Sequence, residues 1–404
     1  MAFYMYLYLA RQPIFNQKLE TVAYELLYRT GDGASNTVNP TLNPDAATSS
    51  VVINAVLNIG LENITGDKPA MVNVTHSFLL DGHVADYLSN QFILEVIETT
   101  HVDDELVRCV REYKEKGFQV ALDDFEYRVE WEPLVAIADI IKLDVLALGE
   151  AGVRQTLDQV KGFTGKWLAE KVENYAEFDL YRGMGFDYFQ GYFLSKPCLI
   201  KEKGIPDSKM TVCRLLSQLA RSDVEPSEVA DTIMQDARLA FKLLKLLNSA
   251  AMGLPRELDS VKQAIIVLGL REMKRWAMLL AVSSVDGKPH ELLVTALVRS
   301  RMCQLLAERM AQDSERAFTV GLLSLFDVLM DMPVERLFDA LPFHADIRRA
   351  VLAYEGSLGG ILSCVLHYEK GDWQRITCKY NLDFFELYIE ALSDVRYGSM
   401  LRSA

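Results

Sequence analysis

The sequence predicts two separate folds, an α/β barrel in the first half of the chain and an all-α domain in the second half. Three observations lead to this prediction. The chain has 404 residues, which is more than one hydrophobic core usually organises. Up to about residue 198, short β-rich runs alternate with helical segments. Beyond that point, apolar residues recur at helical spacing.

Eight β-rich runs are expected to form the strands of the barrel. Their alternation with amphipathic segments favours parallel βαβ units. About eight strands within roughly 200 residues fit a compact (β/α)₈, TIM-like barrel over residues 1–200. The clearest helix is Asp104–Lys116, which Gly117 is expected to end. The expected strands are Tyr4–Ala10, Thr21–Tyr28, Ala70–Val74, Gln91–Ile97, Gln119–Asp123, Ile140–Leu143, Lys166–Val172 and Tyr188–Phe193.

Two polar segments are expected to connect these elements rather than to form strands or helices. Gly31–Ser50 is rich in Gly, Asn, Pro, Thr and Ser, which indicates an exposed loop. Lys201–Lys209 contains Gly and Pro and is expected to be the linker to a helical domain over residues 210–404. The helices expected there are Met210–Ala220, Ser227–Ala237, Leu239–Ser249, Val261–Leu268, Glu272–Ser283, Leu292–Ala311 and Ala317–Met330.

Composition narrows the classes of function. The formal net charge is −14, which argues against non-specific binding to nucleic acid or to an anionic membrane. The six cysteines are scattered without CxxC spacing, which is typical of reduced thiols in a cytoplasmic protein. No stretch reaches the roughly 20 apolar residues of a membrane span. The apolar N-terminus lacks a basic region and is expected to be a strand rather than a signal peptide.

Acidic residues stand where several of the expected strands end. Since the ends of parallel strands meet at one rim of a barrel, these side chains are expected to converge on one site. Carboxylate and amide oxygens are the ligands that hard divalent cations prefer. Each residue taken singly has an alternative explanation, because a strand-end Asp or Glu is often the N-cap of the next helix. The residues are Glu25, Glu95, Asp123, Asp124 and Glu170, with the polar Asn73 at a further strand end.

Eight short segments in order make the first half resemble the EAL family of cyclic-di-GMP phosphodiesterases. No single segment is specific, but their order is. They are Arg11-Gln12-Pro13-Ile14, Tyr24-Glu25-Leu26-Leu27-Tyr28-Arg29, Val72-Asn73-Val74-Thr75, Leu94-Glu95-Val96-Ile97-Glu98, Leu122-Asp123-Asp124-Phe125, Ile141-Lys142-Leu143-Asp144, Ala169-Glu170-Lys171-Val172-Glu173, and Gln190-Gly191-Tyr192 with Ser195-Lys196-Pro197.

The resemblance implies a role for each matching residue. The implied activity is hydrolysis of cyclic-di-GMP to a linear dinucleotide, with Mg²⁺ or Mn²⁺ bound at the site. Lys142 and Glu170 would be catalytic, with Glu170 as the base. Gln12, Arg29, Glu173 and Gln190 would contact the substrate. The implied metal ligands are Glu25, Asn73, Glu95, Asp123, Asp124 and Glu170.

The chain departs from the family pattern in the groups that support these residues. The loop after the aspartate pair, Glu126–Glu132, has no glycine and carries three acidic residues. Lys171 replaces a glycine next to the proposed base. A loop without glycine is not expected to adopt turns with positive φ cheaply. Because the family pairs through this loop, a chain lacking it is expected to dimerise differently or not at all.

Two hypotheses about the barrel therefore stay open. In the first, favoured by the altered loop, the barrel is a divergent, weak or inactive one that binds cyclic-di-GMP or a protein partner and signals through the second half. In the second, it is an active phosphodiesterase. The altered loop at Glu126–Glu132 is the sequence feature that separates them.

The second half resembles the HDOD family, a non-catalytic relative of HD phosphohydrolases. The two halves together are similar to EAL–HDOD, or YuxH-like, fusion proteins. Phe241–Ala250 resembles the HDOD core helix. Ser324-Leu325, within Gly321–Asp327, stands where HD hydrolases carry their metal-binding His-Asp pair. A hydroxyl and an alkyl group cannot replace imidazole and carboxylate as ligands. This half is therefore expected to be an output or scaffold module that contacts a protein partner.

Overall fold

The chain folds into two compact units, Met1–Leu194 and Ser195–Ala404. The computed structural model describes residues 5–32, 60–80, 91–191, 193, 215–221, 223–235, 237–248, 258–283, 289–330, 333–340, 343–372, 375–376 and 383–399. Of the expected loop Gly31–Ser50, Gly31 and Asp32 belong to a strand and the rest lies outside these residues, as does the expected linker Lys201–Lys209.

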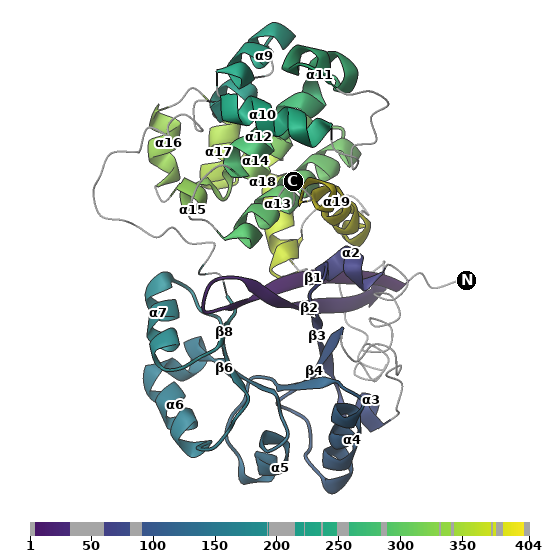
Figure 1. Cartoon of the computed structure of the whole chain (residues 1–404), viewed down its shortest axis with the longest axis vertical. Coiled ribbons are helices and arrows are strands. Elements are labelled where there is room, and N and C mark those ends of the chain that lie inside the picture. Colours follow the sequence, from purple (N-terminus) through teal and green to yellow (C-terminus); the bar gives the residue numbers. More distant parts are fainter. Residues whose placement is uncertain are drawn as a thin grey trace. The chain divides into compact units, whose positions relative to one another are not determined.

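The first unit is a closed barrel whose strands follow one another in sequence order around the ring (Figure 1). Neighbouring strands from β2 to β8 pair in parallel, whereas β1 is antiparallel to both β2 and β8. The predicted, mainly parallel TIM-like barrel is thus confirmed, with one exception at its start. The strands are β1 Met5–Asn16, β2 Thr21–Asp32, β3 Ala70–Val74, β4 Phe92–Val96, β5 Gln119–Leu122, β6 Ile140–Asp144, β7 Lys166–Glu170 and β8 Tyr188–Phe189.

A tight turn rather than a helix joins the first two strands. Asn16 Oδ1 accepts hydrogen bonds from the backbone N–H groups of Lys18 at 2.8 Å and Glu20 at 3.0 Å. Such Asx-type bonds reverse the chain within a few residues. As a result β1 extends six residues past the expected end at Ala10, and residues 11–15 pair with β2.

The remaining barrel strands are covered by short helices outside the ring (Figure 1). In α4 the Asp103 side chain caps the first turn by accepting from Leu106 N at 2.8 Å. Leu106, Val110 and Tyr113 are the buried residues of α4 and lie on one face of the helix. The helical elements are α2 Leu61–Thr65, α3 His76–Leu80, α4 Asp104–Glu115, the 3₁₀ turn η1 Val129–Trp131, α5 Glu132–Val135, α6 Val145–Gln159 and α7 Tyr175–Gly183.

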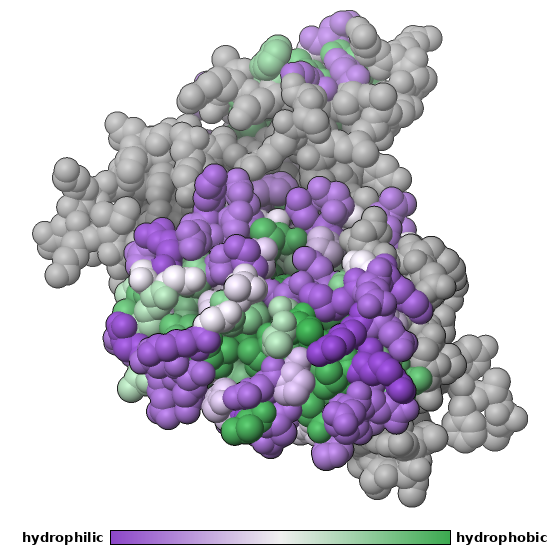
Figure 2. Space-filling model, turned by 60° about the horizontal axis from the view of Figure 1, so that its bottom comes forward, coloured by the Kyte–Doolittle hydropathy of each residue, from purple (hydrophilic) through white to green (hydrophobic). Residues whose placement is uncertain are grey.

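One layer of apolar side chains from successive strands packs together inside the barrel. Outside the barrel, hydrophilic residues form most of the described surface in the view of Figure 2, with apolar residues between them. Inside, each of β1 to β7 supplies one residue to the apolar cluster, and Tyr188 of β8 packs against it. The cluster consists of Ile14, Ala23, Met71, Ile93, Ala121, Ile140 and Leu168. This layer is the floor on which the polar residues described below stand.

The described part of the second unit is helical, as predicted. Ser260 caps α11 by accepting from Gln263 N at 3.2 Å, and Gly269 ends it with φ 82°. The helices are α9 Pro226–Met234, α10 Ala237–Leu247, α11 Val261–Leu268, α12 Leu270–Ser283, α13 His290–Arg309, α14 Ser314–Leu323, α15 Phe326–Met330, α16 Val334–Ala340, α17 Ala345–Ala353, α18 Gly356–Glu369 and α19 Phe384–Ser399.

The prediction of one continuous helix over Ala317–Met330 is wrong. That stretch forms α14 and α15, which are separated at Ser324. Helix α14 approaches α13 so closely at Gly321 that a Cβ there would lie 2.6 Å from the Cα of Ser300. Ser324 Oγ donates back to the carbonyl of Gly321 at 2.7 Å and accepts from Arg299. The interruption therefore follows from packing and from a side chain on another helix.

Among the described residues, the segment Ala345–Glu369 is long and apolar enough to cross a membrane by length and composition. It is divided into α17 and α18, and Tyr354 between them has φ 57°. Leu358, Ile361, Leu362 and Val365 of α18 are buried within the protein. Core helices pass the same test of length and composition.

Candidate functional site

The predicted strand-end residues form the second inward layer of the barrel. Because side chains alternate between the two faces of a strand, a residue two positions beyond a core residue faces the same way. Each site residue stands two positions from the interior residue of its own strand, after it on the parallel strands and before it on β1. This layer consists of Gln12, Glu25, Asn73, Glu95, Asp123, Lys142, Glu170 and Gln190.

Lys142 lies at the centre of this layer, and its side chain is only 1% exposed. Its Nζ donates to Asp123 Oδ1 at 2.8 Å and to the carboxylate of Glu95. Nζ also lies 2.9 Å from Glu170 Oε1 and 3.5 Å from Glu25 Oε2. The ordinary interpretation of a lysine after an apolar run, a solvated strand end, does not hold here.

Four carboxyl groups thus surround one ammonium group. Burial raises the pKa of Glu95 well above its ordinary value and that of Glu170 to about 8, although Lys142 opposes both shifts. For Lys142, burial opposes the charge, but the carboxylates outweigh it, led by Glu170 and Glu25, and raise its pKa. Glu95 Oε2 and Glu170 Oε2 are buried without a hydrogen-bond partner. These four carboxylates are called the inner group below.

Oxygen donors in this arrangement fit a hard divalent cation. Mg²⁺ and Mn²⁺ prefer carboxylate, carbonyl and water oxygens. Asn73 is paired in register with Glu95, across β3 and β4, so its amide belongs to the same layer. The two buried oxygens without a partner are what an ion would satisfy, since a buried carboxylate left without a partner is costly.

Two glutamines extend the site toward the strands that close the ring. Gln190 Nε2 donates to Glu25 Oε2 at 2.6 Å and to Gln12 Oε1 at 3.1 Å. Gly191, next in the chain, has φ 146°, and a Cβ there would lie 2.2 Å from the carbonyl oxygen of Val172. Only glycine allows this close approach, which keeps Gln190 at the site.

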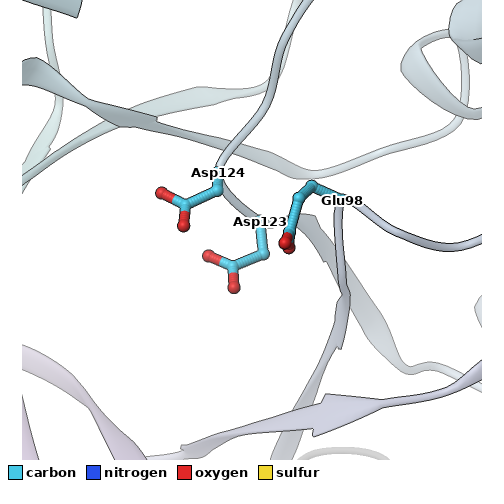
Figure 3. Close-up of side chains that lie close together, drawn as sticks. All are labelled: Glu98, Asp123 and Asp124. Carbon is cyan, nitrogen blue, oxygen red and sulfur yellow. The ribbon is translucent and has the colours of Figure 1, made fainter. Parts of the chain in front are cut away.

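A second set of carboxylates lies beside the first. Ligand atoms of Glu98, Asp123 and Asp124 all lie within 4.8 Å of one another (Figure 3). Glu98 follows Glu95 by three residues and was not among the predicted ligands, although its segment was recognised; its place just beyond the end of β4 was the available signal. Burial raises the pKa of Asp124, and Asp123 adds to this effect. Glu98, Asp123 and Asp124 are called the outer group below.

Lys171 stands at the mouth of the site with a backbone conformation that is unusual for its residue type. Its φ is 56°, in the left-handed region that glycine occupies most easily. Its Nζ donates to Asp144 Oδ2 and lies 4.0 Å from Asp124 Oδ1. Asp144 is itself held in place, because its Oδ1 caps α6 by accepting from Leu146 N and Ala147 N.

The loop after the aspartate pair has the backbone that its composition predicts. None of the residues Glu126–Glu132 has a positive φ, whereas Asp124, in the pair before the loop, has φ 37°. Aspartate tolerates this region better than most residues, which explains how the turn at the pair forms. Phe125 and Trp131 are buried and meet edge to face, with ring centroids 6.1 Å apart. The loop is therefore anchored by aromatic packing.

Two of the predicted substrate contacts are not placed in this cluster by the described contacts. The side chain of Arg29 lies outside the described residues. Glu173 lies between β7 and α7, where its backbone N–H donates to Glu177 Oε2 at 2.8 Å.

In the second unit an ion pair lies beside Ser324, one of the two residues expected in place of metal ligands. Arg299 Nη2 lies 2.6 Å from Glu369 Oε2, and Arg299 Nη1 donates to Ser324 Oγ at 2.9 Å. Leu325 is buried in the core. Among the described residues of the second unit, no three His, Cys, Asp or Glu side chains bring their ligand atoms together as the outer group does in the barrel.

Comparison with known proteins identifies relatives of both units. The family model of the EAL domain matches residues 6–197, and that of the HDOD domain matches residues 205–330. The cyclic di-GMP phosphodiesterase CdgJ of Vibrio cholerae is 33% identical over 376 residues, covering 91% of this chain and 86% of its own length. The uncharacterized protein YuxH of Bacillus subtilis is 33% identical over 406 residues, covering 96% of this chain and 98% of its own.

A solved structure also matches part of the chain. The crystal structure of an EAL domain protein from Listeria monocytogenes EGD-e matches with a TM-score of 0.36 and 21% identity, covering 46% of this chain and 86% of that one.

Proposed function

Because this chain belongs to the EAL family and carries an HDOD domain after its barrel, we propose that it is a cyclic-di-GMP signalling protein whose barrel hydrolyses that dinucleotide. One observation carries the proposal: the inner group is assembled around Lys142, with two buried carboxylate oxygens lacking a partner. The relative named as a cyclic di-GMP phosphodiesterase aligns along 91% of the chain, which supports the same substrate here.

The proposed cofactor is Mg²⁺ or Mn²⁺. Its ligands would come from Glu25, Asn73, Glu95, Asp123, Asp124 and Glu170, which offer only oxygen donors. When bound, the ion would supply positive charge that favours ionisation of a water molecule and offsets the charge of the phosphate. The carboxylate of Glu170 would then accept the proton of that water, as a general base.

The remaining polar residues of the layer would bind and orient the dinucleotide. Lys142 stays charged among the carboxylates, and its charge would offset the negative charge that develops on the reacting phosphate oxygens. The amides of Gln12 and Gln190 can hold the dinucleotide at the closing strands. Arg29, whose planar guanidinium matches a phosphate, and Glu173 complete the proposed substrate contacts.

The second candidate function is binding of cyclic-di-GMP without cleavage. Its support is the loop Glu126–Glu132, where Glu126, Glu130 and Glu132 add negative charge near a site for a dianionic ligand. In that case the barrel would act as a sensor. In both cases the HDOD unit would contact a protein partner in the cytoplasm, since Ser324 and Leu325 stand in place of metal ligands.

The test is incubation of the purified whole chain with cyclic-di-GMP and Mn²⁺, followed by chromatography for the linear dinucleotide. We expect product from the wild type and at least about 100-fold less from Glu95→Gln, because outer-shell partners alone are worth roughly 10–100-fold. Glu105→Gln is the matched control, since Glu105 is 61% exposed on α4, and its rate should equal that of the wild type.

Calorimetric titration of the same proteins with cyclic-di-GMP separates the two candidates. Binding without product would favour the sensor. If the protein has the circular dichroism of a folded chain but neither binds nor cleaves cyclic-di-GMP, both candidates are overturned. A protein-interaction module would then remain.

A further inference from the structure

We propose that the second unit binds a small oxyanion, a carboxylate or a phosphate, in a pocket between α12, α13 and α14, with Lys274 as the cation that receives it. The inference goes beyond the proposed function and does not depend on it, because all of the pocket residues belong to the second unit. It gives this unit a ligand of its own.

The pocket is a partly open cavity with polar and apolar walls. Its lining residues come from α12, α13, α14 and the segment before α9. The space open to the centre of a water-sized sphere is about 30 Å³, which holds about two water molecules or one small ion. Leu219, Met278 and Phe318 are buried and form the apolar part of the wall. A ligand with a charged head and a short apolar tail fits this lining.

Lys274 is a buried ammonium group without a counter-ion. The residue is 6% exposed, and its Nζ donates to the carbonyl oxygen of Arg221 at 2.6 Å. Within the described parts of the chain, no carboxylate forms an ion pair with this Nζ. Burial lowers the pKa of Lys274, although Glu315 and Asp223 oppose the shift. Two of the three N–H donors of the ammonium group are thus left for a ligand.

The two arginines that line the same pocket already have partners. Arg271 Nη2 lies 3.2 Å from Glu308 Oε1, and Arg275 Nη2 lies 3.1 Å from Glu272 Oε2. Water in the cavity would accept hydrogen bonds from Lys274 but would bring no charge. Because a buried charge is costly unless it is paired, a bound anion compensates Lys274 better than water does.

Gln304 supplies a second set of donors. It is 2% exposed and lines the pocket, and its Oε1 accepts from Arg301 Nη1 at 3.0 Å. Since a guanidinium group only donates, this contact fixes which end of the amide is the oxygen. The Nε2 end makes no hydrogen bond to another residue that the structure describes. The acid among the lining residues, Glu315, is exposed, so water solvates its charge.

The experiment follows the methyl group of Met278 by NMR, in the whole chain labelled with carbon-13 at its methionine methyl groups. Met278→Leu identifies the resonance. We expect a saturable shift of this resonance with isobutyrate, with inorganic phosphate or with both. A shift with one anion alone supports the inference and identifies the chemical class of the ligand. Isobutyramide, which has the shape of isobutyrate but no charge, should cause no saturable shift.

Lys274→Gln removes the charge and keeps a donor for the carbonyl of Arg221. It should weaken anion binding at least about tenfold, because hydrogen bonds to charged groups are the strong ones. The matched control is Lys262→Gln on α11, where the lysine side chain is 62% exposed, and it should bind as the wild type does.

Three results would overturn the inference. They are no saturable shift of the Met278 resonance with either anion, equal affinity for isobutyrate and isobutyramide, and wild-type affinity in a folded Lys274→Gln variant. The comparison of isobutyrate with isobutyramide uses the wild type, so it decides the matter even if the variant does not fold. All three results leave the proposed function of the barrel intact.

Discussion

At the scale of single residues, the site depends on groups that neither local propensity nor solvation would favour. Lys142 is buried, and removing an ion from water costs several kcal/mol unless partners offset it. Here the offset comes from carboxylates two positions beyond the interior layer on their strands. The same residues that would bind a cation also hold the lysine, so structure and proposed chemistry are coupled at each of them.

Tyr354 offers a test of backbone strain at this scale. It ends α17 with φ 57°, and its side chain is exposed. Because the left-handed region costs an L-residue roughly 1–2 kcal/mol, Tyr354→Gly should be more stable than Tyr354→Ala by about 1 kcal/mol. Urea unfolding of the two variants measures the difference. Equal stabilities would show that φ at this position relaxes.

The predictable part of the site is the part that follows from strand alternation. Strand-end acids such as Glu25 and Glu95 are visible in the sequence because they interrupt apolar runs. The positive φ of Lys171 and the grouping of Glu98 with Asp123 are not visible, because they depend on how the connecting segments turn after each strand. Asp144 likewise needed coordinates, since its contact with Lys171 spans 27 residues.

At the scale of elements, Arg299 and Glu369 join α13 to α18 and Ser324 at the end of α14. Arg299→Met would leave a largely buried carboxylate without its partner, so it should destabilise the chain by roughly 3–5 kcal/mol. The double variant Arg299→Met with Glu369→Met removes both charges and should recover most of that loss. Thermal unfolding of the second unit within the whole chain measures the stability of both variants. A double variant as unstable as the single one would contradict this account.

Helices with a local cap or a clear apolar face were predicted closely. Val261–Leu268 has both, and its predicted bounds equal those of α11. The break between α14 and α15 was missed because its cause, Arg299, lies on another helix. The length of β1 was missed because residues 11–16 contain the polar side chains of Arg11, Gln12 and Asn16, of which Gln12 faces the site. Tertiary contacts thus overrode the local pattern at both places.

At the scale of the whole molecule, the net charge of −14 opposes the approach of a dianionic dinucleotide. A divalent ion at the inner group would add positive charge at the site and so offset this repulsion locally. Removing it with EDTA should therefore weaken cyclic-di-GMP binding by at least about tenfold, and more at low ionic strength, where the Debye length is roughly 30 Å. Titrations with and without EDTA at low and high salt measure this. Affinity that is indifferent to EDTA would contradict the prediction.

The strands that close the ring, β1 and β8, are joined by only two register pairs. β1 and β8 share only the pairs Phe15–Phe189 and Asn16–Tyr188, whereas β1 and β2 pair along most of their length. Gln12 and Gln190 reach across this joint from either side. A ligand that forms hydrogen bonds with both amides would link the first strand of the barrel to the last. Ligand binding would then stabilise the closure of the barrel, in which the last strand, β8, precedes the segment that continues into the helical half.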